Sequence, residues 1–274
     1  MVQAAAALQR AHGVARIGFA RRGTATIVRE CYQEAGLRVR MPRVEPGLPV
    51  EAVVINTAGG LTGGDRFALA ISADEDATAV VTSQAAEKVY RSSGDVATFD
   101  TRIALASGAS LDWLPQETIL FDGGALRRSL DVDMAGSARF LAVESVVFGR
   151  LAHGESVDEG FLFDRWRIRR DGRLIYAEGL KIDGAVARAL AAPAVGGGAV
   201  ATASLILVGA DAAGCLEAVR HLLEKDGGAV EGGASAFEGM LAVRLLSPDP
   251  FALRRRLIDV LTLLRGPVPR VWSC

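Results

Sequence analysis

Three stretches of the sequence place polar and charged side chains in runs that otherwise read as buried strands: VVTSQAAEKVYRSSGD, LDWLPQETILFDGG and FLAVESVVFG. The residues concerned are Gln84, Glu87, Lys88, Tyr90, Arg91, Gln116, Glu117 and Glu144. A carboxylate in apolar surroundings is unfavourable unless it is paired with a cation or reached by water. These acids could therefore line a polar passage or hold a cation, or two of them could act as a general acid and base.

The same residues also allow a purely structural interpretation. Lys88, Arg91 and Arg150 could neutralise the acids as ion pairs, and the residues by themselves leave both alternatives open. Glu144 is the acid for which the sequence indicates burial most clearly. Strand alternation puts it on one face with Ala142 and Val146, so this face is interrupted by a charge.

A glycine-rich segment, INTAGGLTGGDRF at residues 55–67, raises the question of a phosphate site. A P-loop requires Lys and then Ser or Thr after its last glycine, whereas Gly64 is followed by Asp65 and Arg66. The dinucleotide spacing of glycines does not fit either. Because RFALAISADED then alternates apolar and polar residues, the loop is expected to join two strands.

Signatures of hydrolytic enzymes are missing from the sequence. His12, His153 and His221 are the three histidines, and none lies in a G-x-S-x-G or H-E-x-x-H motif. His221 is expected on the polar side of a helix as an ordinary surface residue. Cys274 at the chain end could bind a soft or borderline metal, but it has no neighbouring ligand in the sequence.

Composition excludes further classes of function. With 31 Lys and Arg against 32 Asp and Glu, the formal net charge is −1, which argues against a nucleic-acid binder held by a strongly basic field. No apolar run reaches the length of a membrane span, and the apolar N-terminal stretch is too short for a signal peptide. The three cysteines lack a C-x-x-C spacing, as a reducing compartment permits. A cytoplasmic location is expected.

The elements that must position the charged residues are mostly short strands. From about residue 13 to residue 189, turn signals such as FDGG, AHGES and RDGR separate alternating segments. The clearest hairpin is RWRIRRDGRLIYAE, where Asp171 and Gly172 suit a two-residue turn. Alternation puts Trp166 on its buried face and the arginines on a solvated face. The fold class is therefore expected to be mainly β.

After AAPAVGGGAV the pattern changes to strands that alternate with helices. A first helix is expected from an N-cap at Asp211 to about Lys225. A second is expected to be capped by Asp249, to have Pro250 at its first position and to end before Gly266. We expect a single domain over residues 1–274, with an all-β scaffold at 1–200 and a C-terminal α+β lobe at 201–274 packed on it.

Four motifs then follow one another between Asn56 and Glu155: NTAGGLTGGD, TSQAAEKVYRS, LPQETILFDGG and ESVVFGRLAHGE. In this order and at these separations they resemble the urease accessory proteins of the UreD (also called UreH) family, and the chain looks like a full-length member. The resemblance implies that the glycine-rich loop belongs to a β-helix-like scaffold of many short strands. The C-terminal α+β lobe with its two helices would complete it.

The resemblance also points to residues that are critical for the scaffold or that line a passage for nickel. These are Asp65, Gln84, Glu87, Lys88, Tyr90, Arg91, Glu117, Glu144, Arg150 and Glu155. His153 lies among the matched residues and is a further candidate metal contact, as is Cys274. Carboxylate, carbonyl and water ligands would hold nickel(II) weakly enough to release it, whereas a Cys/His cage would trap it.

Membership would imply a non-enzymatic chaperone of urease maturation. Its partners would be a helical accessory protein of the UreF type, a nickel-binding GTPase of the UreG type and the urease apoprotein, with no nucleic acid and no membrane. A water-filled tunnel is the family's proposed nickel route, so transient nickel(II) is expected and no tightly bound cofactor.

Two other functions remain as alternatives. A secreted-type β-helix enzyme acting on polysaccharide could use a pair among Glu87, Glu117 and Glu144 as acid and base. The chain has only three tryptophans and three tyrosines to offer as sugar platforms, and it shows no secretion signal. The other alternative is an interaction scaffold that works without a metal.

Overall fold

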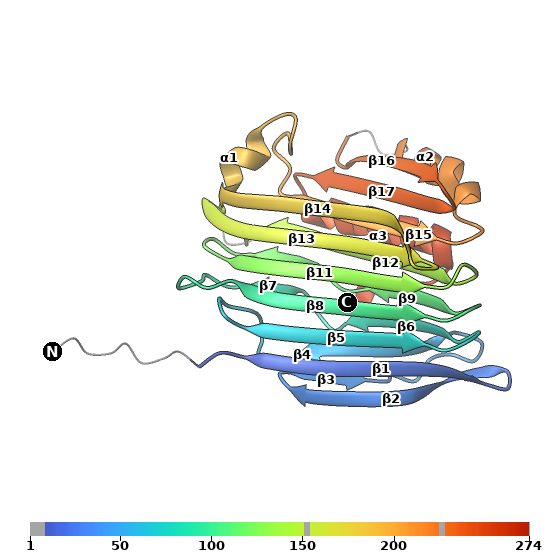
Figure 1. Ribbon diagram of the computed structural model, residues 1–274. Helices are drawn as coiled ribbons and strands as arrows, with labels where there is room; N and C mark the ends of the chain where they lie inside the picture. Colours follow the sequence, from blue (N-terminus) through green and yellow to red (C-terminus); the bar gives the residue numbers. More distant parts are fainter. Residues whose placement is uncertain (1–8, 151–153, 225–227, 274) are drawn as a thin grey trace.

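The structure is a computed structural model that describes residues 9–150, 154–224 and 228–273 (Figure 1). Two β-sheets lie face to face in this part of the chain. Sheet A has seven strands in the spatial order β14 (Arg173–Ala185), β13 (Glu159–Arg170), β11 (Ala125–Met134), β8 (Ala97–Leu105), β5 (Arg66–Ala73), β1 (His12–Arg22) and β2 (Ala25–Ala35).

Sheet B has ten strands within the described residues. Eight of them follow the order β16 (Glu231–Phe237), β17 (Met240–Ser247), β15 (Ala201–Val208), β12 (Arg139–Phe148), β9 (Ser110–Leu114), β6 (Thr78–Ser83), β4 (Val50–Asn56) and β3 (Leu37–Arg40). Two short strands, β7 (Glu87–Val89) and β10 (Thr118–Leu120), lie beside this path, with β10 paired to both β12 and β7.

The chain winds from one sheet to the other and back. Strands β5, β8, β11 and β13 pair in parallel in sheet A, while β4, β6, β9 and β12 follow the same direction in sheet B. Parallel strands need long crossover connections, and here each crossover is a strand of the opposite sheet. The predicted mainly β fold with stacked, β-helix-like coils is confirmed (Figure 1).

Two turns behave as their residue types predict. The glycine-rich loop joins β4 to β5, so it connects two strands and does not open a helix. Asp171 and Gly172 connect β13 to β14 with positive φ at both positions, 51° and 79°. A two-residue turn of this type matches the twist of antiparallel strands, and Asp-Gly tolerates it.

Apolar residues form two separate cores. One fills the space between the sheets and includes Ala142 and Val146 from β12. The other lies between the opposite face of sheet B and the C-terminal helices, and includes Leu141 and Val143. The predicted alternation around Glu144 is therefore confirmed: this acid points into the space between the two sheets.

The C-terminal strands β15 and β17 extend sheet B, with β15 antiparallel to β12 and β17 antiparallel to β15, and two helices cover its outer face. These are α2 (Leu216–Glu224) and α3 (Pro250–Arg265). The second begins as predicted, since the Asp249 side chain accepts a hydrogen bond from the backbone N–H of Phe251. No helix among the described residues is long and apolar enough to cross a membrane.

Two local expectations were wrong. The helix expected from Asp211 starts later, because a 3₁₀ turn, η2 (Ala213–Cys215), precedes α2. The Asp211 carboxylate does not cap it and instead accepts from Arg139 Nε at 3.3 Å. A short helix that the sequence did not indicate, α1 (Val186–Ala191), lies within the region expected to be all-β. A last 3₁₀ turn, η3 (Arg270–Trp272), follows α3.

Candidate functional site

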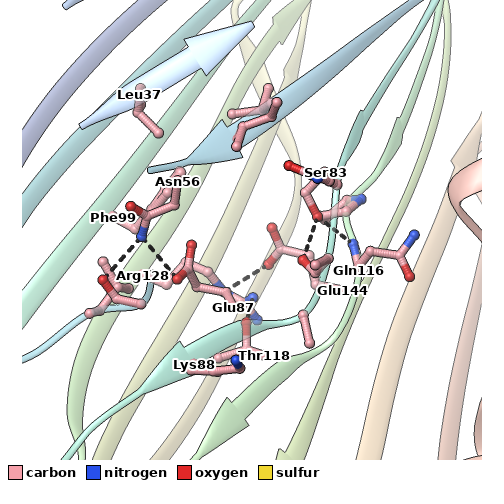
Figure 2. Close-up of a pocket in the computed structure, with 18 of the residues that line it drawn as sticks. Leu37, Asn56, Ser83, Glu87, Lys88, Phe99, Gln116, Thr118, Arg128 and Glu144 are labelled. Atoms are coloured by element: carbon pink, nitrogen blue, oxygen red, sulfur yellow. Dashed lines mark hydrogen bonds and ion pairs between the residues drawn. The ribbon is translucent and has the colours of Figure 1, made fainter. Parts of the chain in front are cut away.

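A cavity of about 280 Å³ lies between the two sheets beneath the glycine-rich loop. We call it the interior chamber. Figure 2 shows that its polar side chains come from different coils of the scaffold. Its polar and charged lining includes Asn56, Glu87, Lys88, Gln116, Thr118, Arg128 and Glu144.

Glu144 is held by two tryptophans. Its side chain is 3% exposed. Trp113 Nε1 donates to its Oε1 at 3.0 Å, and Trp166 Nε1 donates to its Oε2 at 2.9 Å. Both indoles belong to the inter-sheet core, so the carboxylate is fixed by rigid neighbours from β9 and β13.

Arg128 from β11 is the cation beside this carboxylate. Its Nε lies 3.1 Å from Glu144 Oε2, and its Nη2 donates to Asp164 on β13. The Nη1 group donates to Thr118 Oγ1 at 2.9 Å. One buried guanidinium therefore bridges two buried acids, and its planar fork suits such a role.

Glu87 is the first residue of β7 and lines the chamber. Asn56 Nδ2 donates to its Oε1 at 3.0 Å and to the Gly60 carbonyl at 3.2 Å, so the glycine-rich loop positions this acid directly. Burial raises the pKa of Glu87 to about 7, and the hydrogen bond from Asn56 opposes the shift only in part. Near neutral pH this carboxyl can hold or release a proton.

Three acids, Glu87, Glu144 and Asp164, lie around Arg128, and the exposed Lys88 is a second cation of the chamber lining. Burial raises the pKa of Glu144, and the adjacent Asp164 carboxylate adds to the effect, while Arg128 and the two indoles oppose it. Burial alone would lower the pKa of Arg128, but Asp164 and Glu144 raise it above its ordinary value. Arg128 therefore stays charged. When all three acids are ionised, they exceed Arg128 and Lys88 by one negative charge, which favours a mobile cation.

A larger groove of about 740 Å³ lies on the other side of β7 and β10, next to α3. Lys88 lines both spaces. Between them, Arg254 Nη1 donates to Gln116 Oε1 at 2.7 Å and to Glu117 Oε2 at 2.9 Å. The chain end closes this wall, because Gln116 Nε2 donates to the Val271 carbonyl at 3.2 Å.

The residues predicted from the sequence fall into three groups. Gln84, Glu87, Lys88 and Glu144 line the interior chamber. Lys88 also lines the groove, together with Tyr90, Glu117 and Arg150. The remaining three, Asp65, Arg91 and Glu155, line neither space.

Asp65 has a scaffold role. It is buried, and its two oxygens accept the backbone N–H groups of Ala11 at 2.7 Å and Thr62 at 2.8 Å. These bonds tie the glycine-rich loop to the segment before β1. With both oxygens engaged by the backbone, Asp65 stabilises the loop.

The structural interpretation that paired the acids with Lys88, Arg91 and Arg150 was wrong in its partners. Arg91 pairs with Asp122, and Arg150 Nη2 lies 2.7 Å from Glu155 Oε1. No ion pair of Lys88 occurs among the described residues. The cations that neutralise the acids are Arg128 for Glu144 and Arg254 for Glu117.

Sequence reasoning missed six residues of the site: Asn56, Trp113, Thr118, Arg128, Asp164 and Trp166. Alternation along LRRSLDVDM gave a usable signal, since it puts Arg128 on the same strand face as the apolar Leu126 and Leu130. His153 and Cys274 lie outside the described residues. Within those residues, no group of three or more His, Cys, Asp or Glu side chains is placed to hold a metal ion.

Comparison with known proteins places the chain in a family. The profile of the UreD urease accessory protein family matches residues 11–273. A urease accessory protein UreD of Rhizobium etli is 51% identical over 267 residues, covering 97% of this chain and 96% of the relative. The protein of the same name from Azorhizobium caulinodans is 44% identical over 266 residues, covering 97% of each chain.

The coiled two-sheet fold and the acidic interior chamber define a β-helix-like scaffold protein. The chain belongs to the UreD urease accessory protein family, as the four motifs between Asn56 and Glu155 indicated.

Proposed function

We propose that this protein is a non-enzymatic chaperone of urease maturation and that the interior chamber is part of the route by which nickel(II) reaches the urease apoprotein. The observation that carries the proposal is the group of three acids around Arg128 at a cavity below the glycine-rich loop. Related proteins over nearly the whole length are named urease accessory proteins.

The two acids of the chamber would have different tasks. Both oxygens of Glu144 are engaged by indole N–H groups, so it contributes charge and not a free ligand atom. Glu87 accepts one hydrogen bond, at Oε1, and its Oε2 accepts none among the described residues. Carboxylate oxygen and water are weak ligands for nickel(II) compared with thiolate or several imidazoles, which suits a cargo that must leave again.

The pKa of Glu87, about 7, fits such a task. A metal ligand must lose its proton, so nickel binding at Glu87 would release one near neutral pH. Because one proton leaves as nickel(II) binds, loading would raise the charge of the site by one unit instead of two.

The partners would be a helical accessory protein of the UreF type, a nickel-binding GTPase of the UreG type and the urease apoprotein, in the cytoplasm. The scaffold would bridge the first two to urease. Neither nucleic acid nor a membrane has a place in this function.

The experiment that tests the nickel route is reconstituted urease activation with Glu87→Gln. Complex formation with the partners should be unchanged, while the nickel content of urease should fall severalfold. The matched control is Glu217→Gln, which removes an acid that is 81% exposed in a surface ion pair. Full nickel loading by Glu87→Gln and Glu144→Gln together, with intact assembly, would leave the metal-independent scaffold as the function.

Direct metal binding gives a second test. Calorimetry on the isolated protein should detect weak nickel binding with little preference over cobalt or zinc, following the general order of divalent ions. One very tight nickel site would contradict a route and indicate storage.

A further inference from the structure

The outer face of sheet A carries a regular array of arginines. Four successive cross-strand rows on β5, β8, β11 and β13 define it. The arginines that point outwards in these rows are Arg66, Arg102, Arg127, Arg165, Arg167 and Arg169. We call this surface the arginine face.

Strand register fixes the spacing of the array. Arg102, Asp131 and Arg167 lie side by side in one row, and Asp133 pairs with Arg169 in the next. Neighbouring strands are about 4.8 Å apart and alternate residues along a strand are about 7 Å apart. The charges therefore form a grid on a rigid support.

Most of these arginines have no acidic partner among the residues that the structure describes. Arg165 Nη2 lies 2.6 Å from Asp131 Oδ2. The other five form no ion pair in the described part of the chain, and Arg127 lies over the Phe163 ring at 5.7 Å. Three aspartates stand in the same four rows, Asp100, Asp131 and Asp133, while Glu159 and Asp183 lie near the rim.

The two outer faces of the scaffold differ in their cover. Helices α2 and α3 cover the outer face of sheet B and bury its apolar side chains. The ribbon leaves the outer face of sheet A open, with β13, β11, β8 and β5 stacked across it (Figure 1). Parallel sheets in proteins are usually covered on both faces.

We propose that the arginine face is a docking surface for an acidic protein partner. Arginine binds carboxylates in a bidentate geometry and is enriched in protein interfaces. Small residues between the arginines, such as Ala68 and Ala104, project little from the sheet and so allow a partner to approach closely. A partner would present carboxylates to the unpaired arginines and a cation to Asp133.

The aspartates distinguish a protein from a polyanion with a continuous phosphate backbone. Asp100, Asp131 and Asp133 stand between the arginines and would repel successive phosphates. The chain as a whole has a formal net charge of −1 and lacks the basic field of nucleic-acid binders. The face and the interior chamber lie on opposite sides of sheet A, so this inference does not depend on a nickel route.

The test compares two triple variants of the full chain with equal net charge. One, Arg102→Ser/Arg127→Ser/Arg167→Ser, removes cations of the arginine face. The control, Arg22→Ser/Arg43→Ser/Arg188→Ser, removes exposed arginines elsewhere that form no ion pair in the described structure. Because all six side chains point outwards or are exposed, both variants should unfold at the same denaturant concentration as the parent.

The probe is a fluorescent oligoglutamate peptide, measured by anisotropy at low and at physiological salt. Binding should weaken with salt, should fall at least about tenfold in the face variant and should persist in the control. The proposal is overturned by equal loss in both variants or by no binding to the parent. Tighter binding of an oligonucleotide or of phosphatidylserine vesicles at equal charge would overturn it too, by assigning the face to phosphate.

Discussion

Replacing Glu144 by Gln separates the structural role of this acid from its electrostatic role in the interior chamber. The carboxylate accepts one indole N–H on each oxygen, from Trp113 at 3.0 Å and from Trp166 at 2.9 Å. A Gln amide has one oxygen, so its NH₂ group would face one of these donors or the Arg128 guanidinium. One buried donor would lose its acceptor, at a cost of about 1–3 kcal/mol.

Arg128 keeps other partners after this substitution, which limits the loss of stability. Arg128 keeps its second acid, Asp164, and its hydrogen bond to Thr118 Oγ1. An unpaired buried charge would cost about 3–5 kcal/mol, but Glu144→Gln does not create one. We therefore expect the variant to fold and to lose about 1–3 kcal/mol in free energy of unfolding.

Urea unfolding followed by tryptophan fluorescence measures this loss, because two of the three tryptophans contact Glu144. Glu217→Gln is the control and should change stability by less than about 0.5 kcal/mol. A loss of stability no larger than that of the control would refute the argument that a buried donor loses its acceptor. A loss above about 5 kcal/mol would show that Arg128 depends on Glu144 alone.

The same preparation tests the chamber as a nickel route. The Glu144→Gln variant should still assemble with its partners, because the side chain is buried between the sheets and not on the surface. The nickel content of urease should fall, since the variant removes one negative charge from the chamber. Normal assembly with fully loaded urease would exclude Glu144 from the route.

Three further predictions concern pH, the loop and the chain end. Because the folded pKa of Glu87 is about 7 against an ordinary value of 4.5, the native state binds this proton more tightly than the unfolded state. Stability should then fall as pH rises from about 4.5 to about 7, by at most about 3 kcal/mol, and Glu87→Gln should flatten this part of the profile in urea titrations. Gly60→Ala should destabilise the loop by more than Gly59→Ala, because its Cβ would lie 2.4 Å from the Tyr90 ring while that of Gly59 meets nothing within 4 Å; equal unfolding midpoints would contradict the clash. Trp272→Ala should cost about 3–5 kcal/mol, since this side chain is buried and donates to the Leu114 carbonyl, and a loss under about 1 kcal/mol would show that the chain end is not part of the core.

Local signals in the sequence predicted the features that local physics decides. The turn at Asp171 and Gly172, the start of α3 at Asp249 and the alternation around Glu144 each depend on a few adjacent residues. Asp211 is a residue at which the local signal gave a wrong prediction. It is a good N-cap residue, but Arg139, 72 positions away, offers it an ion pair instead.

The partners of the acids could not be read from the motifs, because the fold places them one coil apart. Trp113 and Glu144 are separated by 31 positions, Arg128 and Asp164 by 36, and Arg91 and Asp122 by 31. The cations in the same motif as an acid are near it in sequence, but they lie farther along the same strand or at the surface and do not pair with it. Because the length of each coil cannot be read from the sequence, the strand register is unknown, and so are the side chains that meet across neighbouring coils.

The pair Arg127–Arg128 shows how much depends on that register. These adjacent residues of β11 point to opposite sides of sheet A: Arg127 outwards to the arginine face, and Arg128 inwards to Glu144 and Asp164. A slip of one residue would exchange them, exposing the buried cation and leaving both acids unpaired. Arg128 is enough to hold Glu144 and Asp164 in place, and since Lys88 also lines the chamber, a second buried arginine would leave it no net negative charge. The same strand can therefore support an anionic interior and a cationic exterior because its side chains alternate with a period of two.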